Sequence, residues 1–129
     1  MRDGICGLVR RYGMVFVIGG SASGAKEYAV RYYVEQLQAQ GDLILNYQDE
    51  IRQEMDDIAT DTDPMESAQT LAKNNTAGVI HMQEMGCGIV PIEKKDREYR
   101  ELVGRISCLF AEHADEVYRV ICGIAQKIK

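Results

Sequence analysis

The stretch from Met14 to Tyr28 constrains the fold of this chain more than any other. An apolar run, VFVI, stops abruptly at the sequence GGSASG, and a segment with helical spacing follows it. A buried strand, a turn of small residues and a helix N-terminus together form an anion-binding nest, because backbone N–H groups and the helix dipole point into the turn. The stretch therefore predicts an α/β fold with a phosphate-binding turn.

The turn follows the phosphate-loop pattern G-x-x-x-x-G-K-[ST] in its glycines but not in its last two residues. Gly19 and Gly24 have the required spacing, whereas Ala25 stands at the lysine position and Lys26 at the hydroxyl position. Small residues leave the backbone uncovered for phosphate contact, although a plain link between strand and helix is the alternative interpretation. The residues predicted to bind phosphate are Gly19, Gly20, Ser21, Ala22, Ser23, Gly24, Ala25 and Lys26.

The rest of the chain alternates short apolar runs with segments of helical spacing. The apolar runs predict strands at residues 15–18, 43–45, 77–82 and 116–122. The helical spacing predicts helices at residues 25–40, 47–57, 64–73 and 93–113, and a short basic tail follows the last strand. This alternation favours one domain over residues 14–129, an α/β three-layer sandwich with a mostly parallel sheet flanked by helices. Residues 1–13 are expected to form a loosely ordered extension.

Charge and hydropathy argue against two classes of partner. The net charge of -5 and the pI near 5.0 leave no dominant basic face for nucleic acid. The longest apolar runs are far too short to cross a membrane. The four cysteines show no C-x-x-C spacing, which favours buried or idle thiols in a reducing cytoplasm over disulfides or a zinc site. These features predict a cytoplasmic protein without a membrane span.

A second loop, MQEMGCGIVP, follows the predicted strand at residues 77–82. In a parallel sheet this loop and the glycine turn leave the same edge, where ligands bind, so we expect the two to converge. Glu84 is placed to bind Mg²⁺ directly or through water, to help hold nucleotide phosphates, or to serve the substrate hydroxyl. An ordinary loop acid between glycine turns is the alternative interpretation.

Arg97 and Arg100 lie on one side of the predicted helix at residues 93–113, opposite its apolar stripe. The stripe consists of Tyr99, Leu102, Val103, Ile106, Leu109 and Phe110. The two arginines are either phosphate ligands or part of a solvated face. Gly104 lies on the same side and lowers helix stability, which indicates that another group approaches closely there.

Four segments resemble, in order, the signature segments of the adenosylcobinamide kinase/adenosylcobinamide-phosphate guanylyltransferase family: GGSASG, QEMGCGIVP, REYRELVGR and ADEVYRVICGIAQKIK. The likeness is close from Val79 to Lys129, extends over Met14 to about Ala29, and is weak in between. The resemblance implies a P-loop fold and an oligomeric assembly. It also implies that GTP or ATP, with Mg²⁺, serves to phosphorylate adenosylcobinamide, whose phosphate is then joined to GMP.

Two departures from the family pattern bear on this activity. Ala25 offers neither a lysine nor a hydroxyl, and Lys26 is turned by about 100° and moved by about 1.5 Å along a helix, although its long stem can approach a phosphate. The family's guanylyl transfer uses a covalent histidine–GMP intermediate, but residues 41–76 contain no histidine. His81 and His113 lie in a predicted strand and late in a long helix, where a histidine is more often structural.

Three hypotheses remain open from the sequence. The first is a cobinamide kinase-like protein in which Glu84 and Lys26 are catalytic and Arg97 or Arg100 neutralises phosphate charge. The second is a non-catalytic relative that binds nucleotide or corrinoid, as a pseudoenzyme or a regulatory subunit. The third is a structural remnant without a ligand.

Overall fold

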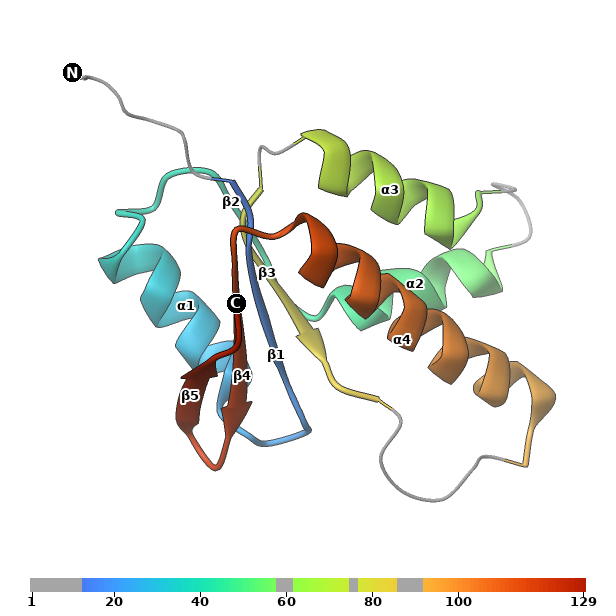
Figure 1. The fold of residues 1–129 in the computed structure, drawn as a ribbon. Helices are drawn as coiled ribbons and strands as arrows, with labels where there is room; N and C mark the ends of the chain where they lie inside the picture. Colours follow the sequence, from blue (N-terminus) through green and yellow to red (C-terminus); the bar gives the residue numbers. More distant parts are fainter. Residues whose placement is uncertain (1–12, 58–61, 75–76, 86–91) are drawn as a thin grey trace.

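The computed structural model describes residues 13–57, 62–74, 77–85 and 92–129, which form a five-stranded sheet with helices on both faces (Figure 1). The strands are β1 (Val15–Gly19), β2 (Asp42–Ile44), β3 (Ala77–Gln83), β4 (Glu116–Ile121) and β5 (Ile124–Lys127). The helices are α1 (Ala25–Glu35), α2 (Tyr47–Asp56), α3 (Pro64–Asn74) and α4 (Lys94–His113).

The sheet has the strand order β2-β3-β1-β4-β5. Strands β1 to β4 pair in parallel, and only β5 runs antiparallel to its neighbour β4. The strand β1 lies at the centre because Val15, Phe16 and Val17 form a continuous apolar run that can be buried on both faces. The predicted α/β fold with a mostly parallel sheet is confirmed.

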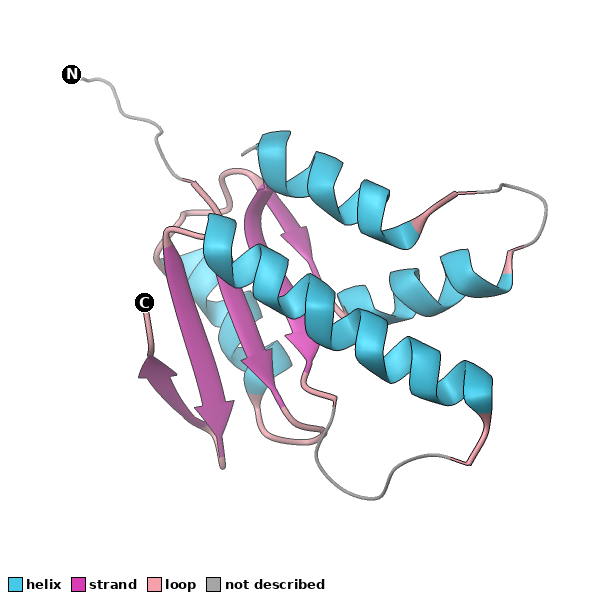
Figure 2. Ribbon diagram, turned by 45° about the vertical axis from the view of Figure 1, so that its right-hand side comes forward, coloured by secondary structure: helices cyan, strands magenta, loops and turns pink. Residues whose placement is uncertain are grey.

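The helices form two layers around the sheet. Helix α1 covers one face, and α2, α3 and α4 cover the other (Figures 1 and 2). Alternate side chains of β1 follow this division: Val15 and Val17 pack in the α1 layer, whereas Phe16 packs edge-on against Phe110 of α4. The apolar stripe predicted for α4 is therefore confirmed, with Val103, Ile106 and Phe110 fully buried. In the described part of the chain, no helix is both long and apolar enough to cross a bilayer.

Two sequence predictions are wrong at element boundaries. The basic tail is the strand β5, which a tight turn with Cys122 at φ 52° and Gly123 at φ 76° joins to β4. Helix α1 ends at Glu35 rather than at residue 40, because the chain then turns through two residues with positive φ, Gln38 and Ala39. The hydroxyl of Tyr33 closes this turn by sharing its one proton between the carbonyl oxygens of residues 39 and 41.

Candidate functional site

The glycine loop joins β1 to α1 at the carboxyl edge of the sheet. Gly24 has φ 92° and ψ 5°, a left-handed conformation that L side chains rarely adopt, and α1 begins at the next residue. Within the loop, the N–H of Ser23 donates to the carbonyl of Gly20 at 3.2 Å, and the Ser23 hydroxyl accepts from the N–H of Ala25 at 3.3 Å. The first helical bond runs from Tyr28 N–H to the Gly24 carbonyl, so the N–H groups of Lys26 and Glu27 at the start of α1 have no helical acceptor.

The glycines at the two ends of the loop are required by close packing. A Cβ on Gly19 would lie only 2.5 Å from the Ser23 hydroxyl oxygen and 2.8 Å from the Val120 carbonyl oxygen. A Cβ on Gly24 would lie 3.1 Å from the Cα of Gly123, in the turn between β4 and β5. The N–H of Gly123 also donates to the Ser23 carbonyl at 2.7 Å. The loop is therefore held from behind by β4 and its turn.

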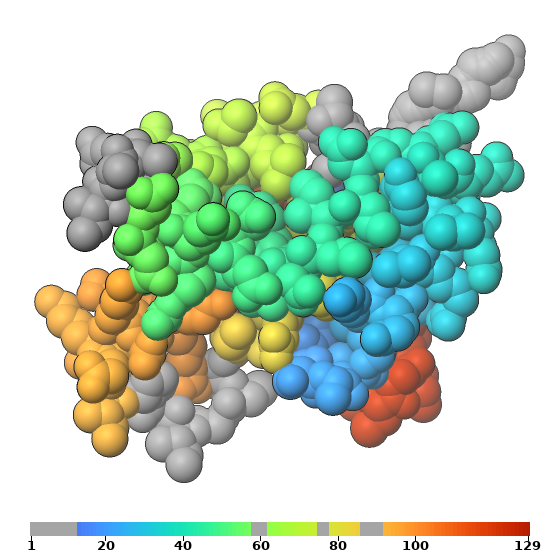
Figure 3. All heavy atoms as spheres, turned by 180° about the vertical axis from the view of Figure 1, so that it is seen from behind, coloured from blue at the N-terminus to red at the C-terminus, as the bar shows by residue number. Residues whose placement is uncertain are grey.

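A cavity of about 280 Å³ opens on the other side of the loop. It lies between the loop, the first turn of α1 and the ends of β2 and β3, and Figure 3 shows these segments side by side on the molecular surface. The lining residues are Gly20, Ser21, Ala22, Ser23, Gly24, Ala25, Lys26, Glu27, Asn46, His81 and Gln83. Seven of the eight residues predicted in the loop line this cavity, and Gly19 packs behind it.

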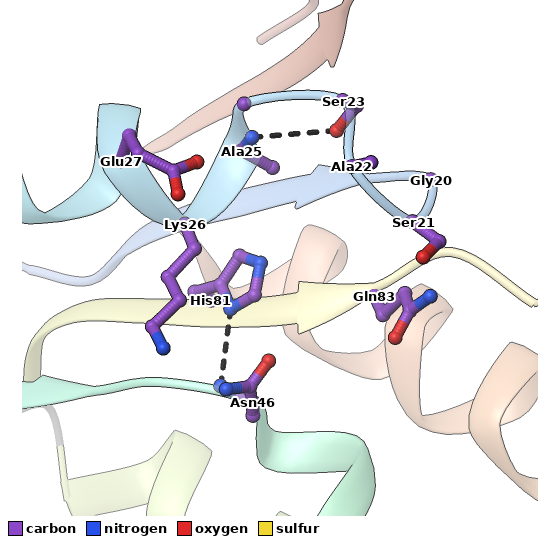
Figure 4. Close-up of a pocket in the computed structure, with 11 residues that line it drawn as sticks. Gly20, Ser21, Ala22, Ser23, Ala25, Lys26, Glu27, Asn46, His81 and Gln83 are labelled. Atoms are coloured by element: carbon purple, nitrogen blue, oxygen red, sulfur yellow. Dashed lines mark hydrogen bonds between the residues drawn. The ribbon is translucent and has the colours of Figure 1, made fainter.

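The two residues that depart from the phosphate-loop pattern have different surroundings. Ala25 is only 3% exposed, and its methyl group packs against the backbone of Gly19. Lys26 is exposed, and its side chain extends away from the loop toward Asn46, passing beside His81 (Figure 4). The ammonium group therefore lies at the far side of the cavity rather than over the loop amides.

A polar wall that the sequence analysis did not identify faces the loop. Asn46 has φ 56°, which asparagine tolerates, and its N–H donates to Nδ1 of His81 at 3.0 Å. Burial of the imidazole and the nearby Lys26 ammonium hold the pKa of His81 below its usual value, against a smaller opposing effect of Glu27. His81 is thus a neutral, 4% exposed side chain in the cavity wall.

Gln48, at the start of α2, connects the residues of this wall through hydrogen bonds of its side-chain amide. Its side-chain oxygen accepts the N–H of Gln83 at 2.9 Å, and its amide nitrogen lies 3.3 Å from the Asn46 side-chain oxygen. Gln48 is 4% exposed, so these bonds satisfy a buried amide and fix the end of β3 to the end of β2. The available sequence signal was position: Asn46 and Gln83 are polar residues close to the carboxyl ends of β2 and β3, at the ligand-binding edge.

Glu84 connects the second loop to the glycine loop. Its N–H donates to the carbonyl of Gly19 at 2.7 Å, so the first residue after β3 lies beside the start of the glycine loop. Its carboxylate is held by Arg119 of β4, through Nε at 3.2 Å and Nη2 at 2.9 Å. Residues 86–91, which carry the two glycines of this loop, lie outside the described residues.

The arginines of α4 do not line the cavity. Arg97 donates to the carbonyl of Ile92 at the start of the helix, and Arg100 is a half-buried residue three positions further along α4. A Cβ on Gly104 would meet nothing within 4 Å, so the close approach expected at this glycine does not occur in the part of the chain that the structure describes. The proposed roles of Arg97 and Arg100 therefore require a ligand that extends beyond the cavity.

The residues at the site do not match the donors of a phosphate-loop magnesium site. Lys26, a cation, stands where a hydroxyl would bind Mg²⁺, and both oxygens of Glu84 are engaged by Arg119. Among the described residues, no group of three His, Cys, Asp or Glu side chains is placed to hold a metal ion. The metal-binding role of Glu84 stays a prediction.

Comparison with known proteins identifies the family. The family model described as cobinamide kinase / cobinamide phosphate guanyltransferase matches residues 41–128, from the residue before β2 to the residue after β5. This chain belongs to that family. A bifunctional adenosylcobalamin biosynthesis protein CobU from Salmonella typhimurium is 43% identical over 51 residues, and its counterpart from Escherichia coli is 41% identical over 51 residues.

The alignments to these two members of the cobinamide kinase / cobinamide phosphate guanyltransferase family are partial. Each covers 40% of this chain and 28% of the relative. The family match begins after the glycine loop, so the assignment of that loop rests on its own geometry. Because the alignments are partial, the complete activity of these relatives is only proposed for this chain.

Proposed function

We propose that this chain binds the triphosphate of GTP or ATP in its glycine loop and acts as a cobinamide kinase-like protein of cobalamin biosynthesis. One observation carries the proposal: the left-handed Gly24 turns the loop and the N-terminus of α1 toward a cavity of about 280 Å³. Backbone N–H groups at such a helix start bind phosphate without any particular side chain. The departures at Ala25 and Lys26 therefore leave the anion-binding part of the loop intact.

The reaction would be phosphoryl transfer to adenosylcobinamide. A hydroxyl oxygen of the corrinoid attacks the γ-phosphorus, the bond from that phosphorus to the β–γ bridging oxygen breaks, and the nucleoside diphosphate leaves. Positioning and charge neutralisation do most of the work in such transfers. Lys26 would supply positive charge from the far side of the cavity, and Glu84 would accept the hydroxyl proton if Arg119 releases its carboxylate.

A second candidate is a non-catalytic nucleotide- or corrinoid-binding relative, a pseudoenzyme or a regulatory subunit. Two observations favour it: Ala25 is buried where a lysine would reach the phosphates, and Arg119 holds both oxygens of Glu84. Residues 41–76 also contain no histidine for a covalent GMP intermediate. The first candidate phosphorylates its substrate, whereas the second binds nucleotide or corrinoid without turnover.

Calorimetry with GTP and ATP, with and without Mg²⁺, tests the nucleotide binding that the proposal requires. Micromolar binding is expected, and no heat or thermal shift with millimolar nucleotide would overturn it. Mass spectrometry of adenosylcobinamide after incubation then decides between the candidates, because only a kinase produces phosphorylated corrinoid. Sedimentation of the same sample tests the homo-oligomeric state that the family resemblance implies.

The double variant Ala25→Lys with Lys26→Ser restores the usual order of the loop. A lysine that reaches the β- and γ-phosphates should tighten nucleotide binding by about tenfold or more, since a hydrogen bond to a charged group contributes about 1.5–3 kcal/mol. The single variant Lys26→Ser is the matched control, because it removes the existing charge without adding a lysine. Equal affinities of the double and single variants would show that residue 25 does not face the phosphates.

A further inference from the structure

The cavity beside the glycine loop contains a buried donor without a protein acceptor. Nδ1 of His81 accepts from the N–H of Asn46, so the neutral ring carries its proton on Nε2. Among the described residues, no side chain or carbonyl accepts a hydrogen bond from Nε2. His81 is only 4% exposed, and a buried N–H without an acceptor is costly.

The second ring nitrogen lies on the side of the imidazole away from Asn46. Figure 4 shows the ring beneath the first turn of α1, with the glycine loop, Ser21 and Gln83 on the side of this nitrogen. The charged neighbours, Lys26 and Glu27, both come from α1. A fixed N–H thus points into the same cavity that the loop amides face, from the opposite wall.

We propose that Nε2–H of His81 donates a hydrogen bond to a phosphate oxygen of the nucleotide bound in the glycine loop. The contact replaces one made in an ordinary phosphate loop by the lysine that Ala25 has displaced. The ligand class is an oligophosphate chain, which accepts hydrogen bonds from backbone N–H groups on one side and from a neutral imidazole on the other. This inference rests on the proposed nucleotide binding, and its experiment separates the two.

Two substitutions separate the acceptor function of Nδ1 from the donor function of Nε2. His81→Asn keeps an acceptor near the position of Nδ1 for the Asn46 N–H but removes the Nε2 donor. His81→Gln keeps an N–H donor near the position of Nε2 but removes the Nδ1 acceptor. We expect His81→Asn to melt near the wild-type temperature and to bind GTP at least about tenfold more weakly. We expect His81→Gln to lose more stability and less affinity.

Inorganic tripolyphosphate, titrated beside GTP, tests whether the contact is with phosphate. The proposal requires that His81→Asn weakens the binding of both ligands by a similar factor. If His81→Asn binds both as tightly as the wild type, the His81 contact is overturned while nucleotide binding stands. Weakening for GTP alone would place the histidine against the sugar or base and overturn it too. If the wild type binds neither ligand, both proposals fail.

The wild-type protein provides a test that does not depend on a variant folding. The chain has two histidines, and the ring of His113 is exposed at the end of α4, where Nδ1 lies 3.0 Å from the Leu109 carbonyl. In nitrogen NMR spectra, the Nε2–H signal of His81 should shift when tripolyphosphate is added, whereas the His113 signals should not. An unchanged His81 signal at saturating ligand would overturn the contact.

Discussion

Substitution of Gly24 by alanine tests the geometry on which the proposed phosphate loop depends. An alanine held at φ 92° pays about 1–2 kcal/mol for the left-handed backbone. Its Cβ would also stand 3.1 Å from the Cα of Gly123, a backbone atom that cannot rotate away, which adds about 1 kcal/mol of overpacking. The strain in the folded state is therefore about 2–3 kcal/mol.

Gly20→Ala is the matched control in the same loop. A Cβ on Gly20 would meet nothing within 4 Å, and Gly20 is not among the glycines with positive φ. Both variants reduce the freedom of the unfolded chain in the same way, so that contribution cancels when their free energies of unfolding are compared. The difference between Gly24→Ala and Gly20→Ala should thus be about 2–3 kcal/mol in favour of Gly20→Ala.

Urea unfolding followed by circular dichroism measures this difference. With an m-value of about 2 kcal/mol per molar, the midpoint of Gly24→Ala should lie roughly 1 M below that of Gly20→Ala. Gly24→Ala should also weaken GTP binding, because relief of the strain moves the start of α1 away from the loop. Equal midpoints for the two variants would refute the left-handed junction and, with it, the structural basis of the proposed site.

Two further predictions concern the rest of the molecule. The pKa of His81 is lower in the folded protein than in the unfolded chain, so the folded state binds fewer protons and its stability should fall as the pH drops below about 6.5. His81→Asn should remove this part of the slope in thermal unfolding, and an unchanged slope would contradict the assignment. Phe110→Ala removes a fully buried ring whose centroid lies 5.0 Å from that of Tyr47, and should lower the free energy of unfolding by about 3–5 kcal/mol. The control Val34→Ala, at a 57% exposed position, should change it by less than about 0.5 kcal/mol, and a small loss for Phe110→Ala would contradict the close packing of α4.

The sequence predicts the central part of the fold well because burial leaves a pattern in it. The run at residues 15–18 is apolar throughout since β1 is covered on both faces, and the stripe of α4 repeats at helical spacing since one side faces the sheet. The strand β5 has no such pattern, because it is a short edge strand with Ile124 71% exposed. The end of α1 depends on the Tyr33 hydroxyl and on positive φ at Gln38, which no local propensity indicates.

The candidate site divides in the same way between local and non-local features. The loop can be predicted from the sequence because Gly19 and Gly24 are required by the backbone of one short segment. The opposite wall is assembled from His81 and Gln83 of β3 and from Asn46, which follows β2, and these residues meet only through the pairing of β2 with β3. The pairing of Glu84 with Arg119 likewise depends on β4 lying beside β1, which the sequence does not specify.

The contact between Gly123 and the glycine loop has a consequence for the order in which the site is made. During synthesis the loop leaves the ribosome early, whereas the turn that supports it, with its N–H bonded to the Ser23 carbonyl, is translated much later. Until that turn arrives, the loop lacks both its rear wall and the neighbour that fits against Gly24. A ligand of this cavity would therefore bind completed chains more tightly than nascent ones, because the cavity is fully formed only after β4 and β5 have joined the sheet.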